Sequence, residues 1–134
     1  MSANKSYEDL HVWGKAVDFA EWSYNLTASF PKEERYDLTS QMRRAAVSIS
    51  SNIAEGCARN SSGEFIQFLG IATGSPAEIH TQCIIAKRLC YIKENDYLKT
   101  LTFVNEIRKM LNGLKSSIRN AKNKLATRNP ELAT

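Results

Sequence analysis

The pattern that most constrains the fold of this 134-residue chain is a heptad spacing of apolar residues near its C-terminal end. Intervals of three and four residues alternate without interruption along Val104, Ile107, Leu111, Leu114, Ile118, Ala121 and Leu125. Such spacing places all seven side chains on one side of an α-helix, whereas the side chains of a β-strand alternate with a period of two. A helix over residues 96–127 is therefore predicted, and its apolar residues are called the seam.

Helical periodicity also runs through the rest of the chain, in three segments that cover residues 7–29, 37–59 and 62–93. No strand-like alternation or hairpin signal competes with it. The predicted fold class is all-α, an antiparallel up-down four-helix bundle formed as a single domain by residues 1–134. Residues 128–134 are expected to be a flexible tail.

Several residues are expected to set the ends of these helices. Ser6 is a candidate N-cap for the first helix and Asp37 for the second. Ser61 and Glu64 have the spacing of a capping box at the start of the third. Pro76 lies inside the third segment and has no N–H to donate, so a kink or a break is expected just before it.

The apolar surface of these segments is larger than one bundle core requires. Segment 7–29 carries two adjacent apolar stripes, Leu10, Trp13, Val17, Ala20, Tyr24 and Thr27 beside Val12, Ala16, Phe19, Leu26 and Phe30. A flanking stripe of segment 62–93 is apolar at its ends and polar in its middle. A helix in a lone bundle buries only one arc, so this surplus predicts a homo-oligomer.

Composition and charge limit the classes of protein to consider. Apolar residues make up 43% of the chain and charged residues 24%, as in ordinary globular proteins. The longest uncharged run, residues 65–77, is shorter than the roughly 18–20 residues of a membrane-spanning helix. No basic-then-apolar leader is apparent, so a cytoplasmic location without membrane contact is expected.

No residues show the spacing of a catalytic or metal site. His11 and His80 lie in different segments, and the three cysteines do not suggest a disulfide framework. Cys83 and Cys90 fall on the expected core face, where packing is a better explanation than nucleophilic catalysis, and Cys57 has no evident base. The chain is therefore expected not to be an enzyme and to need neither a metal nor a cofactor.

A polar stripe follows one side of segment 37–59 and extends to segment 62–93. It consists of Gln41, Arg44, Ser48, Asn52, Glu55, Arg59, Ser75 and Glu78. We interpret it as a buried, hydrogen-bonded network that fixes helix register or subunit contacts. A binding site along the stripe is the alternative.

Positive charge is concentrated at the C-terminal end. Residues 1–104 carry 11 Lys/Arg and 12 Asp/Glu, a net of −1, whereas residues 105–134 carry 7 and 2, a net of +5. Four of these cations share one side of a helix, with the other three within roughly 40° of Arg108, and we call them the basic face: Arg108, Lys115, Arg119 and Lys122.

The basic face is a candidate site for RNA or DNA phosphates. No aromatic residue interleaves it, so binding would depend on charge and shape rather than on base sequence. A merely solvated helix surface and a contact with an acidic protein are the alternatives.

Five motifs, in order along the chain, resemble those of a known family. They are DLHVW at 9–13, FPKEE at 30–34, LTSQMRRA at 38–45, SISSNIAEG at 48–56 and FLGIATGSPAE at 68–78. Over about residues 7–118 the chain resembles the bacterial four-helix-bundle proteins, also called 23S rRNA-intervening-sequence proteins. The basic stretch at the end matches no motif of that family.

The resemblance implies a ring-like homopentamer of up-down bundles without catalytic activity. Some members are encoded within intervening sequences of ribosomal RNA genes. Related accessory variability determinants of diversity-generating retroelements bind a reverse transcriptase and nucleic acid. The leading hypothesis is therefore a non-enzymatic, oligomeric protein that associates with nucleic acid; the alternative is a protein-interaction scaffold such as a reverse-transcriptase accessory subunit.

Overall fold

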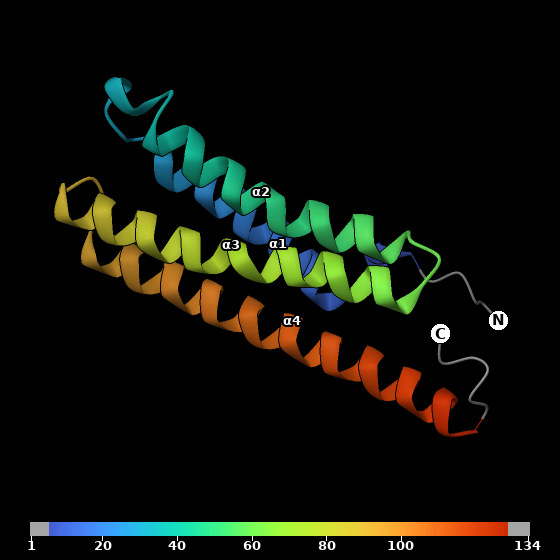
Figure 1. Cartoon of the computed structure of the whole chain (residues 1–134). Coiled ribbons are helices and arrows are strands. Elements are labelled where there is room, and N and C mark those ends of the chain that lie inside the picture. The colour runs from blue at the N-terminus through green and yellow to red at the C-terminus, as the bar shows by residue number, and fades with distance from the viewer. Residues whose placement is uncertain (1–5, 129–134) are drawn as a thin grey trace.

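The computed structural model describes residues 6–128, which form four α-helices and no β-strand. The helices are α1 (His11–Thr27), α2 (Leu38–Cys57), α3 (Ser62–Arg88) and α4 (Glu94–Arg128). Two short 3-10 helices, η1 (Tyr7–Asp9) and η2 (Lys32–Glu34), precede α1 and α2. The four α-helices lie lengthwise beside one another (Figure 1). The prediction of an all-α fold with four helices is confirmed, and no described helix is long and apolar enough to cross a membrane.

The helices pack with unequal extents of contact. α2 and α3 share the most extensive contact, α1 packs mainly on α2, and α4 packs mainly on α3. α1 and α4 touch more lightly. Their contact includes a hydrogen bond of 3.0 Å from Trp22 Nε1 to Thr100 Oγ1 and the rings of Phe19 and Phe103, with centroids 5.4 Å apart. The edge between α1 and α4 is therefore the more open side of the bundle.

A single hydrophobic core runs through the bundle, as expected for one domain. One face of α2 is buried throughout, and it consists of Leu38, Met42, Ala45, Ile49, Ile53 and Gly56. On α1, the core stripe is the one that contains Val12, Ala16 and Phe19. Val17 and Tyr24, from the other predicted stripe, remain exposed.

Gly56 allows α2 and α3 to approach closely near the turn that joins them. A Cβ atom at this position would lie 2.7 Å from Phe68 Cβ, a separation that real Cβ contacts essentially never show. A side chain at position 56 would therefore force the two helices apart.

Two of the three predicted helix caps form hydrogen bonds. The Glu64 N–H donates to Ser61 Oγ at 3.1 Å, and the Ser61 hydroxyl donates to the Glu64 carboxylate at 3.3 Å. Ser6 caps η1 rather than a long helix, because Leu10 is extended and delays the start of α1 to His11. Asp37 holds the predicted N-cap position of α2, but its side chain makes no capping hydrogen bond.

α3 ends at Arg88, five residues before the predicted end of the third helix. Cys90 adopts a left-handed backbone with φ of 63°, which stops the helix. The N–H of Tyr91 then donates to the Ala86 carbonyl at 2.8 Å, and that of Cys90 to the Lys87 carbonyl at 3.0 Å, as in a Schellman motif. Cys90 is exposed, so its expected place in the core is wrong.

The other bounds differ less from the prediction. α3 runs through Pro76 without the break that we expected; Pro76 is buried, and packing around it outweighs one missing hydrogen bond. α4 begins at Glu94 and still includes Arg128. The rest of the expected tail, 129–134, lies outside the described residues.

Candidate nucleic-acid interface

The basic face lies on an uninterrupted helix, so its four members occupy one side of α4 as their spacing predicts. Each of the four directly follows a seam residue. Arg108, Lys115 and Lys122 are half-buried, whereas Arg119 is exposed. Partial burial of the three fits long side chains whose stems lie along apolar surface while their charged ends reach water. From Arg108 to Lys122 the face extends about 21 Å along the helix.

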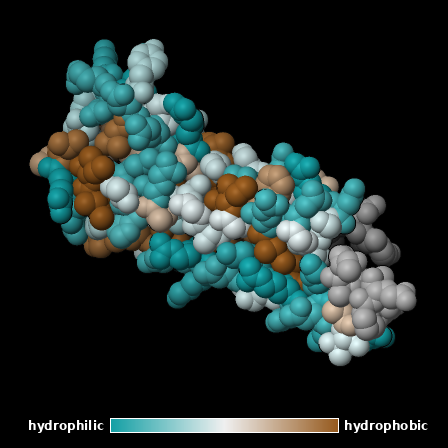
Figure 2. All heavy atoms as spheres, viewed as in Figure 1, coloured by the Kyte–Doolittle hydropathy of each residue, from teal (hydrophilic) through white to brown (hydrophobic). Residues whose placement is uncertain are grey.

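None of these four cations forms an ion pair with another residue in the range 6–128. The ion pairs there join Lys15 to Glu106, Lys87 to Glu94, and Arg59 to Glu55 at 3.6 Å. Glu106 is the carboxylate closest in sequence to Arg108, and it is engaged by Lys15 of α1. The positive charge of the basic face is thus not neutralised locally. Figure 2 shows an almost continuous hydrophilic strip over α4, whereas hydrophobic patches interrupt the face over α3.

The basic face coincides with the part of α4 that leaves the core. The fully buried seam residues end at Leu111, while Leu114 and Ile118 are only partly buried against the core. Ala121 is exposed, and Leu125 is 49% exposed. The last part of the predicted seam is therefore helical without being covered in the single chain.

Three members of the polar stripe form the expected hydrogen-bonded network. Asn52 Nδ2 donates to the Ser48 carbonyl at 2.8 Å and to Ser48 Oγ at 3.0 Å. Ser75 Oγ donates to Ser48 Oγ at 3.4 Å and so links α3 to α2. Ser75 is buried, and Ser48 and Asn52 are half-buried. Gln82 extends this row one turn beyond Glu78, and its buried Oε1 accepts no hydrogen bond from the described residues.

The other members of the stripe are exposed in the single chain, so a buried network that includes them stays a prediction. Glu55 and Arg59 pair with each other on the surface, and Arg59 covers the ring of Phe68. Gln41, Arg44 and Glu78 line a shallow hollow between α2 and α3. The sequence periodicity placed these residues on one side of α2 but carried no information about what covers that side. Their burial would require a second chain.

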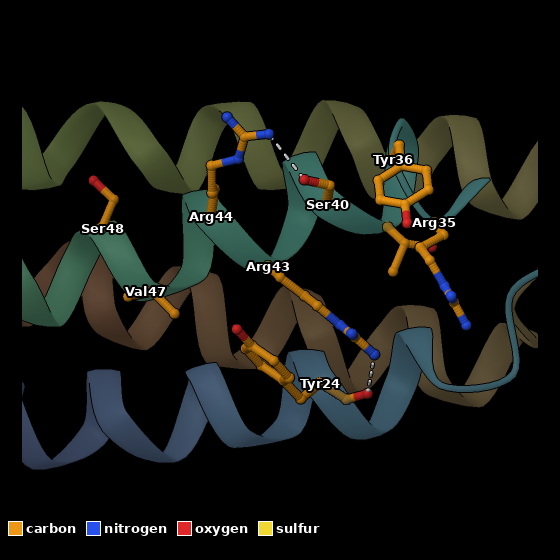
Figure 3. A pocket seen from close by; sticks show the side chains of 9 residues that line it. Tyr24, Arg35, Tyr36, Ser40, Arg43, Arg44, Val47 and Ser48 are labelled. Atoms are coloured by element: carbon orange, nitrogen blue, oxygen red, sulfur yellow. Dashed lines mark hydrogen bonds between the residues drawn. The ribbon is translucent and has the colours of Figure 1, made fainter.

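A second hollow joins residues that the sequence did not suggest as a site (Figure 3). We call it the arginine hollow; its lining is Tyr24, Arg35, Tyr36, Thr39, Ser40, Arg43, Arg44, Val47 and Ser48. Only Arg44 and Ser48 were among the candidate residues, as members of the stripe. Adjacent arginines at 43 and 44 were a local signal, but their meeting with Tyr24 depends on how α1 packs against α2.

Burial disfavours the thiolate form of two of the cysteines, Cys83 and Cys57. Burial raises the pKa of the Cys83 thiol to about 12, although a hydrogen bond with Thr100 opposes the shift. Cys83 is therefore a protonated core residue at neutral pH. Burial also raises the pKa of Cys57. Among residues 6–128, no three His, Cys, Asp or Glu side chains are grouped so that they could hold a metal ion, although His80 lies only three residues before Cys83.

Comparison with known proteins identifies two similarities. The sequence profile described as 23S rRNA-intervening sequence protein matches residues 8–113. A solved structure from Bacteroides thetaiotaomicron, described as a protein with unknown function from the S23 ribosomal protein family, is 27% identical with a TM-score of 0.73. That alignment covers 78% of this chain and 95% of the other. No curated protein sequence matches the chain.

The family match has a bearing on the candidate interface. It ends at residue 113, so it includes Arg108 but not Lys115, Arg119 or Lys122. The greater part of the basic face therefore lies beyond the matched region, and its role has to be argued from its own geometry.

Proposed function

Because the chain belongs to the family of 23S rRNA-intervening sequence proteins, we propose that it is a non-enzymatic, homo-oligomeric bundle that associates with nucleic acid through charge. The observation that carries this proposal is the basic face. Four cations share one side of a helix, and none is paired with a carboxylate among the described residues. An unneutralised row of this kind attracts phosphates and displaces their counterions.

The helices of the proposed bundle follow one another in antiparallel, up-down order. The connection from α2 to α3 covers only residues 58–61, and that from α3 to α4 only residues 89–93. Connections this short favour antiparallel neighbours. The course of the colours in Figure 1, where each helix begins near the end of the preceding one, supports the same order.

A ring-like homopentamer is the proposed assembly. Its support is the exposed apolar surface of α3, where Ile71 is 52% exposed and Ile85 and Leu89 are similarly open. Ile85 and Leu89 follow Ile71 by 14 and 18 positions, so the three residues share one side of α3 and its C-cap. Exposed apolar stripes of this kind mark contact surfaces. Five copies at +4 each would give the assembly a net charge of about +20.

Light scattering of the intact protein tests the assembly. We expect a mass near five times 15.1 kDa, and dissociation when Ile71 and Ile85 are both changed to Glu. The matched control is Thr81→Glu, an acidic substitution at an exposed position of the same helix that should leave the mass unchanged. A monomer mass for the parent protein would overturn the proposed ring.

A filter-binding titration at about 50 mM salt tests the association with nucleic acid. The parent should bind single-stranded RNA and DNA of unrelated sequence alike, with a log–log salt slope of about −0.7 per phosphate contact. Changing all four residues of the basic face to Gln should abolish binding, since their charges supply the contacts.

The matched control removes the same charge elsewhere by changing Lys32, Arg88, Lys93 and Lys99 to Gln, all of them exposed. This control should retain most of the binding and the helicity of the parent. No binding by the parent, or equal binding by both quadruple variants, would overturn the basic face as the contact surface.

A further inference from the structure

The arginine hollow is lined by three arginines near the place where the C-terminal end of α1 meets the start of α2. Arg43 and Arg44 extend from opposite sides of α2 (Figure 3). Arg35 follows η2, and Arg43 and Arg44 are consecutive residues of α2. In Figure 3, Arg43 turns toward Tyr24 of α1, Arg44 turns toward Ser40, and Tyr36 stands beside Arg35. The hollow thus combines cations and aromatic rings, which the basic face of α4 does not.

Two of the arginines are held in fixed positions by neutral partners. Arg43 Nε donates to Thr27 Oγ1 at 2.8 Å, its Nη2 donates to the Tyr24 carbonyl at 3.3 Å, and its guanidinium lies 4.5 Å from the Tyr24 ring centroid. Arg44 Nη2 donates to Ser40 Oγ at 2.9 Å. Each of these two guanidinium groups therefore keeps N–H donors for another ligand. Because the hydrogen bonds already hold both side chains in place, less conformational entropy is lost when a ligand binds.

No Asp or Glu is among the lining residues of the arginine hollow, and none of its arginines forms an ion pair within residues 6–128. Glu78 is an acidic neighbour, which lies in the adjoining hollow beside Arg44 and Tyr36 and forms no ion pair with Arg44 among the described residues. Glu34, a nearby carboxylate, accepts a hydrogen bond of 2.8 Å from the Tyr91 hydroxyl instead. Arginines that form no ion pair favour a phosphate, whose oxygens match the guanidinium fork.

Tyr36 gives the hollow a second kind of contact. Its side chain is 84% exposed, so both the ring and the hydroxyl are largely open to solvent. An exposed aromatic ring beside unpaired arginines is the arrangement with which proteins hold single-stranded nucleic acid, where the base stacks on the ring and the backbone meets the cations.

We propose that the arginine hollow binds a nucleotide unit of single-stranded nucleic acid, with phosphate oxygens on the arginines and the base stacked on Tyr36. This site deepens the proposed association with nucleic acid and rests on it. The basic face holds a strand by charge alone, whereas the hollow adds a contact that requires a base. Any nucleobase satisfies the contact, because every base has a face that can stack.

Fluorescence anisotropy with two labelled strands tests this proposal. One strand is a short oligoadenylate, and the other is an abasic ribose-phosphate strand of the same length. Tyr36→Ala should weaken oligoadenylate binding about ten- to a hundredfold and leave abasic binding unchanged, while Tyr36→Phe should behave like the parent. Arg35→Gln should weaken both strands by more than the matched control Arg88→Gln, which removes one exposed charge outside the hollow.

The outcomes separate this site from the basic face. If the parent binds neither strand, the nucleic-acid association itself is overturned. If the parent binds both and Tyr36→Ala affects them equally, or Arg35→Gln is no worse than Arg88→Gln, the hollow is overturned while the basic face stands. Displacement of oligoadenylate by micromolar AMP would assign the hollow to free nucleotides and overturn the strand-binding site. Circular dichroism should show parental helicity for every variant, because the changed side chains are exposed.

Discussion

The two halves of α4 have the same apolar periodicity and different surroundings. From Val104 to Leu111 the seam is buried against the other helices, and Ile107 has 0% exposure. Beyond Leu111 it becomes half-buried and then, at Leu125, 49% exposed. The basic face begins in the first half and lies mostly along the second.

Helix length accounts for this difference. α4 has 35 residues and is about 52 Å long, whereas α3 has 27 residues and α1 has 17, about 40 Å and 26 Å. The shorter neighbours cannot cover all of α4. The comparison teaches that heptad spacing predicts a helix with one apolar side, while burial of that side depends on whether a partner of matching length is present.

The largest expected effect belongs to the first half of α4. Ile107→Ala should lower the free energy of unfolding by about 2–5 kcal/mol, because it removes a fully buried side chain and leaves a cavity. Urea denaturation followed by circular dichroism measures the change. The matched control is Leu125→Ala in the second half, which should stay within about 0.5 kcal/mol of the parent. Similar losses for both variants would show that the second half is covered in solution.

A smaller effect is expected where α2 and α3 approach most closely. Gly56→Ala should cost about 1–3 kcal/mol of stability, because the new Cβ would lie 2.7 Å from Phe68 Cβ and a packed helix pair must shift. The midpoint of urea unfolding checks this. An unchanged midpoint would mean that α2 and α3 can move apart without cost. The contrast between the tightly packed helices and the uncovered second half of α4 would then be weaker.

The smallest effect should have the opposite sign. Gly113 lies on the exposed side of α4 at the junction of its two halves, and a Cβ atom there would meet nothing within 4 Å. Gly113→Ala should stabilise the protein by about 0.5–1 kcal/mol, because alanine favours the helix and restricts the unfolded chain. Thermal unfolding is the measurement, and a lower melting temperature would indicate that position 113 is packed against a second chain.

Helix patterns made most of the fold predictable from the sequence, and particular residues explain the errors. The end of α3 was misplaced because its left-handed residue is Cys90, whereas the usual signal at such a position is glycine. Asp37 occupies the expected cap position, yet its backbone there is irregular and its side chain makes no capping bond. Local sequence rules give the backbone conformation or capping role that a residue type favours. The packing of the helices determines whether the residue adopts it.

The candidate sites were predictable to different degrees. All four residues of the basic face belong to one helix, so their spacing was sufficient to place them together. The arginine hollow combines Tyr24 of α1 with Arg35 and Tyr36 of a turn and with residues of α2. No sequence spacing relates these elements, and only the packing of α1 on α2 brings them together.

The free end of α4 has a mechanical consequence. Ile118 is the last seam residue that packs against the core, and Arg128 follows ten residues later, about 15 Å along the axis. This stretch extends beyond the last packing contact at Ile118. A bend of about 20° in the helix there would displace Arg128 by about 5 Å. Arg119 and Lys122 lie beyond Ile118, so such a bend would move their charges while the packed body of the bundle stays unchanged.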